Sequence, residues 1–350
     1  MGDQGSNGHR PVTAGEPEGL SRRGFLVGAA GLTGVALSGV WKGAPALAAE
    51  GDPFSAVASG ESGGIRFLEL DGKIVGSLKS VEGGTVVGTV EEEPAAAGVV
   101  KKHIANVKYE EFTVKAGFSM GKPMYDWLKL SFLGKHTRQD GAIHNCDFDG
   151  KIVSSLAFFQ ALITEIGFPA CDASSKEEPD HLTIKFRPES TVRKPGGGQV
   201  TAKPSNQKTW LPANFRITIG DLPTAKVNKI DSFTVKQNFE AVPDGQGGST
   251  LEPTTIEFPN LKVTVAESQP WYDWHEDFLI GGKNDDEQEL TGKLEFLSLD
   301  LSKVLLRMGL EHLGIFGLKP ILPEPNPAAL RRLWAEMYCE QMDFEYRPAT

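Results

Sequence analysis

A strand pattern followed by the tripeptide Tyr-Asp-Trp occurs twice in this chain. Residues 112–116 and residues 261–265 each alternate apolar with polar side chains, and each run is followed by a short turn containing Gly or Pro. An alternation with a period of two predicts a strand with one buried face. The recurrence predicts an internal duplication, which restricts the fold to two similar β-rich halves. The tripeptides are Tyr125, Asp126, Trp127 and Tyr272, Asp273, Trp274.

Three further matches keep the same order along the chain, which makes a chance recurrence of one short string the weaker explanation. The first pairs the openings of the halves, the second an apolar segment containing a glycine, and the third the closing strands. The matched segments are 65–67 with 215–217, 162–168 with 309–315, and 182–188 with 342–348. The closing strands end in Arg187, Pro188 and in Arg347, Pro348.

The N-terminal segment has the pattern of an export signal, and it resembles the twin-arginine motif closely. The motif residues are Ser21, Arg22, Arg23, Phe25 and Leu26. The apolar run that follows suits a signal sequence better than a transmembrane helix. Ala46 and Ala48 form a small-x-small cleavage site, so we expect residues 1–48 to be removed, leaving no stable membrane span. An uncleaved tail is the alternative. The resemblance implies export of the folded protein by the twin-arginine machinery to a periplasmic or extracellular location.

The composition is that of a soluble globular protein with an acidic surface. The chain has 350 residues, 39% of them apolar and 23% charged, and a formal net charge of −10. This length allows two domains that each bury a core. The negative charge argues against binding to nucleic acid or to an anionic membrane surface.

Composition shifts along the chain predict its division into domains. Residues 49–64 are rich in Gly, Ser and Ala and are expected to form a flexible lead-in to a first domain at 65–188. Residues 189–212 contain Gly, Pro, Lys and Ser, and they predict a flexible linker. A second domain is expected at 213–350.

Local patterns predict the elements of each domain. The first domain is expected to contain strands at 65–70, 73–78, 144–148, 151–159 and 182–186, turns at 71–72 and 149–150, a helix at 125–133 and an exposed loop at 91–98. The second is expected to contain one helix more. Residues 326–338 offer an Asn cap and a Pro at the first helical position, with Leu330, Leu333, Trp334 and Met337 on one face.

No pattern predicts a catalytic, cofactor or metal site. His144 and Cys146 would share one face of a strand, but a packed cysteine beside a histidine is the simpler interpretation. The acidic residues around 275–287 lack the spacing of a calcium loop and are expected to form a solvated loop. The cysteines leave two alternatives: a bridge between Cys146 and Cys171, or three buried free thiols, with Cys339 the third. We therefore expect no enzymatic activity and no cofactor.

The order of elements in each half resembles the tail-tube proteins of contractile phages and related injection machines. That order is an Ile/Phe-Arg strand, an alternating strand with a Tyr-Asp-Trp helix start, a Gly/Asp-turned hairpin and a strand ending in Arg-Pro. The resemblance implies a β-sandwich or barrel with one flanking helix, which assembles into six-fold rings that stack into a tube. This chain is doubled and carries an export signal.

Two functions follow as expectations. The first is an exported structural protein that self-associates, as a trimer with a pseudo-six-fold ring, and that could contact other tail-like components. The second is an exported two-domain binding protein or enzyme that uses the cleft between its domains.

Overall fold

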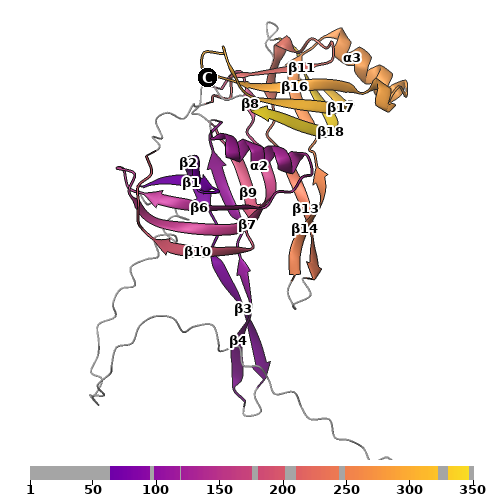
Figure 1. The fold of residues 1–350 in the computed structure, drawn as a ribbon. Helices are drawn as coiled ribbons and strands as arrows, with labels where there is room; N and C mark the ends of the chain where they lie inside the picture. The colour runs from indigo at the N-terminus through magenta and orange to yellow at the C-terminus, as the bar shows by residue number, and fades with distance from the viewer. Residues whose placement is uncertain are drawn as a thin grey trace, which may run out of the picture. The chain divides into compact units, whose positions relative to one another are not determined.

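The computed structural model describes residues 64–94, 98–118, 120–175, 180–201, 210–243, 249–321 and 330–346 (Figure 1). The fold is mainly β, as predicted. The first half contains β1 (Ile65–Leu70), β2 (Lys73–Glu82), β3 (Val86–Pro94), β4 (Val100–Tyr109), β5 (Phe112–Ala116), α2 (Lys122–Phe132), β6 (Gln139–Cys146), β7 (Ile152–Phe168), β8 (Cys171–Asp172), β9 (Leu182–Arg187) and β10 (Ser190–Pro195). The second half contains β11 (Phe215–Ile219), η2 (Thr224–Lys226), β12 (Val227–Ile230), β13 (Phe233–Pro243), β14 (Ser249–Glu257), β15 (Leu261–Ala266), α3 (Gln269–His275), η3 (Glu276–Ile280), η4 (Asp286–Gln288), β16 (Leu290–Leu297), β17 (Val304–Ile321) and β18 (Arg332–Tyr346).

The first half forms a closed barrel. Its strands pair in the order β6-β1-β2-β5-β9-β7, and β7 returns to pair with β6. The predicted alternation in β5 holds, because Phe112, Val114 and Ala116 all point into the core. The predicted turn between β1 and β2 is also confirmed: Asp71 and Gly72 have φ of 47° and 76°, the left-handed pair that a tight hairpin needs.

The second half forms an open half-barrel. Its sheet runs β11-β16-β17-β18-β15-β12-β8, with antiparallel pairing throughout. The strands at the two ends of this sheet do not pair with each other in the described part of the chain. One end strand is β8, which belongs to the first half. The first half therefore adds one strand to that edge of the half-barrel.

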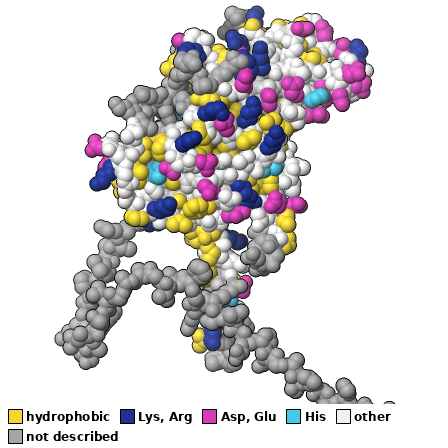
Figure 2. Space-filling model, viewed as in Figure 1, with side chains coloured by type: hydrophobic (Ala, Val, Ile, Leu, Met, Phe, Trp, Pro, Cys, Tyr) yellow, Lys and Arg dark blue, Asp and Glu magenta, His cyan; other side chains and the backbone are white. Residues whose placement is uncertain are grey.

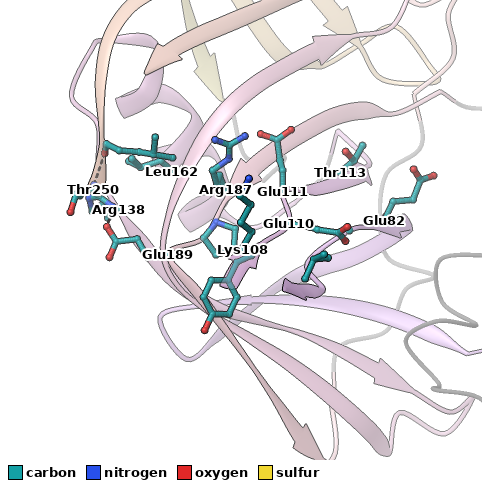
Figure 3. Close-up of a pocket in the computed structure, with 15 residues that line it drawn as sticks. Glu82, Lys108, Glu110, Glu111, Thr113, Arg138, Leu162, Arg187, Glu189 and Thr250 are labelled. Carbon is teal, nitrogen blue, oxygen red and sulfur yellow. Dashed lines mark hydrogen bonds and ion pairs between the residues drawn. The ribbon is translucent and has the colours of Figure 1, made fainter. Parts of the chain in front are cut away.

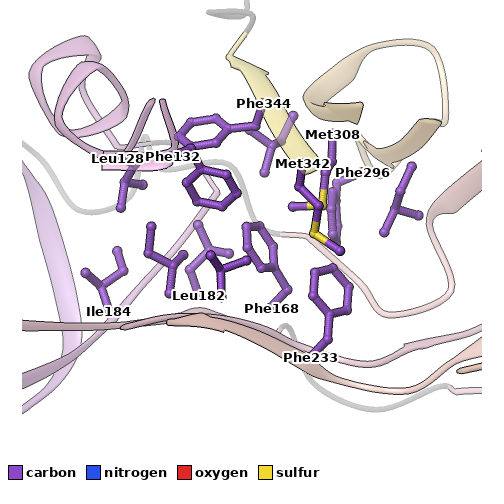
Figure 4. Packing of buried hydrophobic residues seen from close by; sticks show 14 of the residues in the cluster. Leu128, Phe132, Phe168, Leu182, Ile184, Phe233, Phe296, Met308, Met342 and Phe344 are labelled. Carbon is purple, nitrogen blue, oxygen red and sulfur yellow. The ribbon is translucent and has the colours of Figure 1, made fainter. Parts of the chain in front are cut away.

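The two halves share one hydrophobic core. Helix α2 lies between the barrel and β18, and its buried face includes Tyr125, Trp127 and Phe132 (Figure 1). Phe132 meets Phe344 of the second half at a ring distance of 4.9 Å (Figure 4). Tyr125 stacks on Tyr346 with ring centroids 3.8 Å apart. The described residues of both halves consequently group into one compact unit.

The expectation of a flexible linker is wrong for residues 190–195. This stretch forms β10, which pairs antiparallel with β7, so that Thr191 lies opposite Phe158. Val200 and Trp210, near the ends of the same region, are buried. Gly and Pro content alone missed this strand, because its backbone partners are supplied by the long β7 rather than by a neighbour in sequence. The domain boundaries themselves stay a prediction.

The predicted helix at 326–338 is also wrong. Residues 332–346 form β18, and residues 322–329 lie outside the described residues. Leu333 and Met337 are buried, whereas Trp334, assigned to the same helical face, is 42% exposed. The apolar positions fit both periods over this short run, and pairing with β15 and β17 decides for the strand.

The predicted loop at 91–98 is wrong in its first part. Residues 91–94 belong to β3, which pairs with β4 in a two-stranded hairpin. Their acidic side chains are accommodated because the hairpin places Glu92 beside Lys102, at 2.7 Å, and Glu91 near His103. Opposite charges across a strand pair support a hairpin that faces water on both sides.

Candidate assembly surface

A groove of about 1070 Å³ lies at the root of the β3–β4 hairpin. The barrel contributes Glu82, Thr113 and Arg187, the hairpin contributes Lys108 and Tyr109, and β14 contributes Leu251 (Figure 3). Both signs of charge line it. Carboxylates (Glu82, Glu110, Glu111, Glu189) and cations (Lys108, Arg138, Arg187) face the groove together, so it offers binding contacts of either sign.

Arg138 fastens one wall of this groove. Its Nη2 donates to the carbonyl oxygen of Leu251 at 2.7 Å, and its Nη1 pairs with Glu189. Because Arg138 follows α2 and Leu251 lies on β14, this side chain ties the second half's hairpin to the barrel. We interpret Arg138 as a structural clamp.

The β13–β14 hairpin joins the halves through main-chain pairing. Phe233 lies opposite Phe168 and Lys236 opposite Glu165, so β13 extends the barrel sheet along the end of β7. The rings of Phe168 and Phe233 stack at 5.0 Å. Val235, between these pairs, is 4% exposed. The sheet of the first half thus continues into the second half.

The β3–β4 hairpin has no such partner among the described residues (Figure 1). Apolar side chains extend from the barrel onto it (Figure 2). Its exposed apolar residues are Val86, Val87, Val90, Val99, Val100, Ile104 and Val107. An exposed apolar hairpin with unpaired strand edges is a surface that favours association with another chain.

The Tyr-Asp-Trp residues lie in a helix in each half, but α2 begins at Lys122 and α3 at Gln269, before the tripeptides, so the predicted start of the first helix at Tyr125 is too late. Tyr125 and Trp127 are buried in α2, and Trp127 Nε1 donates to the carbonyl of Thr137 at 2.9 Å. In α3, Tyr272 and Trp274 are only partly buried. Trp271, which the sequence pattern did not single out, is the fully buried indole there.

The two aspartates of these tripeptides occupy matching places on the helix surface. Asp126 accepts from Lys122, and Asp273 accepts from Gln269 at 2.8 Å, both one turn earlier in their helices. Such i,i+4 contacts support a short helix modestly. These aspartates are therefore surface supports of α2 and α3.

Arg187 and Pro188, the end of β9, line the groove described above. Their sequence counterparts Arg347 and Pro348 lie outside the described residues. The same holds for the export motif, Ser21, Arg22, Arg23, Phe25 and Leu26, and for the cleavage residues Ala46 and Ala48. In the described part of the chain, no helix has the length and apolar character needed to cross a membrane.

His144 belongs to a network of three polar side chains on β1, β6 and β7. Its Nδ1 lies 2.7 Å from Ser155 Oγ and its Nε2 lies 3.1 Å from Glu69 Oε2. This sequence of groups resembles a hydrolase triad, yet Ser155 is 6% exposed on a regular strand. A substrate could not reach Oγ without opening the sheet, so we interpret this network of side chains as structural.

The cysteines are free and buried. Cys146 packs with Phe67 and Val200 rather than pairing with His144. Burial raises the pKa of Cys171, and it raises the pKa of Cys339 to about 12. Thiols with raised pKa are poor nucleophiles and poor metal ligands at neutral pH. The interpretation as packed thiols therefore holds over a Cys146–Cys171 bridge.

The acidic region at 275–287 is partly helical rather than a loop. His275 ends α3, Glu276–Ile280 forms the π-turn η3, and Asp286–Gln288 forms η4. Glu276 and Asp277 are exposed, as expected of solvated carboxylates. The π-turn places Phe278 in the core, which explains why the chain stays helical here.

A different group of residues could hold a cation. Potential ligand atoms of Glu289, His312 and Glu340 all lie within 4.8 Å of one another. Glu289 already accepts from His312 Nδ1 at 2.7 Å and from the Tyr338 hydroxyl at 2.6 Å. The hydrogen bond to Glu289 raises the pKa of His312, which favours the imidazolium over the neutral ligand form. We interpret this group as an ion-pair network.

Comparisons with known proteins find likeness at the level of structure. No model of a known protein family matches the sequence, and no curated protein matches it. A chain of the sheath–tube complex of an extracellular contractile injection system, PVC, is 11% identical with a TM-score of 0.31, covering 38% of this chain and 89% of that one. The tube-terminating cap of the anti-feeding prophage is 13% identical with a TM-score of 0.31, covering 38% of this chain and 89% of that one. Hcp1 from Flavobacterium johnsoniae is 10% identical with a TM-score of 0.24, covering 38% of this chain and 95% of that one.

Proposed function

We propose that this chain is an exported structural protein that assembles into rings or tubes through the edges of its β-sheets, without enzymatic activity. The observation that carries the proposal is the β7–β13 pairing, in which one half's hairpin extends the other half's sheet. A chain that already joins two similar halves by strand addition can join copies in the same way. The resemblance of the sequence to tail-tube proteins points to the same role.

An internal duplication is part of this proposal. It is supported by irregularities of the strands that occur at corresponding places in the two halves. Strand β2 skips Lys79 where it pairs with β5, and β12 skips Asn228 where it pairs with β15. Gln160 and His312 have φ of 52° and 56° at corresponding places in β7 and β17. Shared defects of this kind are conserved within families of one origin.

The duplication sets the expected number of copies. If each half occupies one position of a six-membered ring, three chains complete it as a trimer with pseudo-six-fold character. The acidic net charge of the chain makes a bore lined by its carboxylates unfavourable for anionic polymers. Export of the folded subunit by the twin-arginine route, with assembly in the periplasm or outside the cell, completes the proposal. Other tail-like components are the partners it implies.

Negative-stain microscopy of the mature protein tests this function. The proposal predicts rings or filaments at micromolar concentration. A uniform field of discrete monomers across salt and pH would contradict it and would favour a monomeric binding protein that uses the groove near Arg187. Incubation with a chaotrope that weakens apolar contacts is a matched control, because it should dissolve the rings before it unfolds the subunit.

A further inference from the structure

The two hairpins can be compared residue by residue. Pairing of β2 with β5 and of β12 with β15 has the same register, including the skipped residue. Continuing this register, Val87 opposite Lys108 corresponds to Lys236 opposite Glu257. Val86 is then the counterpart of Val235.

These counterparts have opposite surroundings. Val235 is 4% exposed and lies opposite Ile166 of β7, whereas Val86 is 53% exposed. In the same register, Val107 is the counterpart of Ile256, which is partly buried against the core, while Val107 is 55% exposed. The second half's hairpin is covered by the first half. The first half's hairpin carries the same apolar positions uncovered.

The edge of β7 that pairs with β13 has a counterpart in the second half, which is an edge of β17. On β7, pairing with β6 ends at Ala161, and β13 takes the same edge from Glu165 onward. On β17, pairing with β16 ends at Leu313, and no described strand takes that edge from Gly314 to Ile321. Matching the bulges of β7 and β17 makes Leu318 the counterpart of Ile166. This register matches residues 162–168 with 314–320, and the pairing of β9 with β5 and of β18 with β15 matches residues 182–186 with 333–337. The sequence matches of 162–168 with 309–315 and of 182–188 with 342–348 are therefore wrong in register.

Apolar side chains flank this unpaired edge. Phe316 and Ile321 on β17 are exposed, and so are Leu279 and Ile280 at the end of the helical segment that packs on β17. In the first half, Phe132 occupies the corresponding end of α2, where it is buried and contacts Phe258 next to β14. Aligning the Tyr-Asp-Trp tripeptides matches Leu279 with Phe132; Leu279 is 47% exposed, and no hairpin in the described part of the chain covers it.

We propose that the β3–β4 hairpin of one copy docks on the β17–α3 face of a second copy, with Val86 opposite Leu318 in an antiparallel ladder. This inference rests on the proposed assembly and specifies its joint. The ladder is short, because Pro320 has no N–H to donate, so burial of Val86, Val107, Leu318 and Leu279 supplies the remaining attraction. The occupant is a second copy of this chain, since the internal β13–β7 joint shows the counterparts of these two surfaces already fitted together.

The joint is head-to-tail, so each chain offers one hairpin and one acceptor edge. Such contacts close into rings or continue as filaments. The bend at Gly83 and Gly84, with φ of 79° and 78°, separates β3 from the barrel strand β2 and directs the hairpin away from its own barrel. A ring of three would satisfy every hairpin and every edge.

Disulfide trapping tests the joint. Directly opposed residues of an antiparallel pair have Cβ atoms close enough to be bridged. The variant carrying Val86→Cys and Leu318→Cys, treated with a mild oxidant at micromolar concentration, should give linked dimers and trimers on a non-reducing gel. The native cysteines are buried and should not contribute. The control carries Val192→Cys with Leu318→Cys, because Val192 is similarly exposed on β10.

Mixing two single variants sharpens the result. Val86→Cys protein mixed with Leu318→Cys protein should yield linked dimers only. Absence of linked species in the double variant, or equal linkage in the Val192 control, overturns the joint. If the unmodified protein forms rings while the double variant does not cross-link, the joint is wrong and the assembly proposal stands. If the unmodified protein is a monomer throughout, both fail.

Discussion

Phe168 and Phe233 lie opposite each other on β7 and β13, and their rings stack with centroids 5.0 Å apart and planes 17° from parallel. Phe168 comes from the closed barrel and Phe233 from the half-barrel's side of the chain. Their contact therefore lies in the joint that continues one sheet into the other half. A joint so deeply packed makes unfolding of the two halves a single event rather than two.

The same substitution should have opposite effects at counterpart positions of the two hairpins. Val235→Asp places a charge in the buried joint and should lower the free energy of unfolding by about 3 kcal/mol or more. Val86→Asp places it on an exposed surface and should change that quantity by less than about 0.5 kcal/mol. Urea titration followed by tryptophan fluorescence measures both, at a concentration low enough to keep wild-type and variant chains monomeric.

Substitution of the exposed Val86 should affect assembly, although it should hardly affect stability. Val86→Asp should prevent rings or trimers at concentrations where the wild-type chain forms them, because the charge would be buried at the joint. Val192→Asp is the matched control and should leave assembly unchanged. A Val86→Asp protein that assembles normally would show that the hairpin takes no part in it.

Tryptophans of the two helices should differ in their importance. Trp127 is 1% exposed and hydrogen-bonded through Nε1, and Trp127→Ala should cost about 3–5 kcal/mol of stability. Trp271→Ala should cost a similar amount, because that indole is fully buried. Trp274→Ala should cost less, since Trp274 is partly exposed. Equal costs for Trp271 and Trp274 in denaturant unfolding would contradict this assignment.

Glu295 should make the protein sensitive to acid. Burial alone would raise the pKa of this carboxylate, but hydrogen bonds from Arg216 and Arg307 outweigh burial and hold the pKa below its usual value. A lowered pKa in the folded state contributes stability that is complete above the unfolded value of about 4.3 and is lost as the pH falls through the folded value.

Glu295→Gln should therefore destabilise the protein by about 2 kcal/mol at pH 7. The difference from wild type should shrink as the pH falls below about 4. Thermal or urea unfolding between pH 7 and pH 3 measures it. Glu345→Gln, at the exposed carboxylate that also contacts Arg307, is the control and should have little effect. A Glu295→Gln difference that is constant with pH would contradict the ion-pair assignment.

The export signal leads to a prediction that is independent of the fold. Arg22→Lys with Arg23→Lys keeps the charge but removes the guanidinium groups that the twin-arginine motif requires. Precursor carrying both changes should stay in the cytoplasm, whereas a precursor with Lys42→Arg should be exported normally. Cell fractionation with immunoblotting measures the distribution. Normal export of the double variant would remove the twin-arginine assignment.

The sequence predicted those elements that depend on local patterns. The Asp71-Gly72 turn, the alternation in β5 and the helix containing Tyr125 all follow from neighbouring residues, and all are present. Where distant partners decide, the local pattern was insufficient. β10 is a strand because β7 extends beside it, and Leu333 lies on a strand because β15 and β17 pair with it.

The same limit applies to the assembly surface. Val86 and Val235 are both valines on a strand, so residue type does not show which of them is buried. Gly83 and Gly84 precede only the exposed hairpin, but a glycine pair predicts a bend and not which surface the hairpin contacts. Only the pairing of Phe233 with Phe168 shows which hairpin is covered within the chain. Trp271 was missed for a related reason, because the search followed the repeated tripeptide and the buried indole lies just before it.

The mass of the mature protein in solution tests the central claim most directly. Sedimentation velocity or native mass spectrometry at micromolar concentration should give three chains per particle, or a filament whose repeating layer contains three chains. Dilution should shift the population toward single chains without unfolding them, since each chain has its own core. A strict monomer across pH, salt and concentration would contradict assembly through the β3–β4 hairpin and the ring proposed from it.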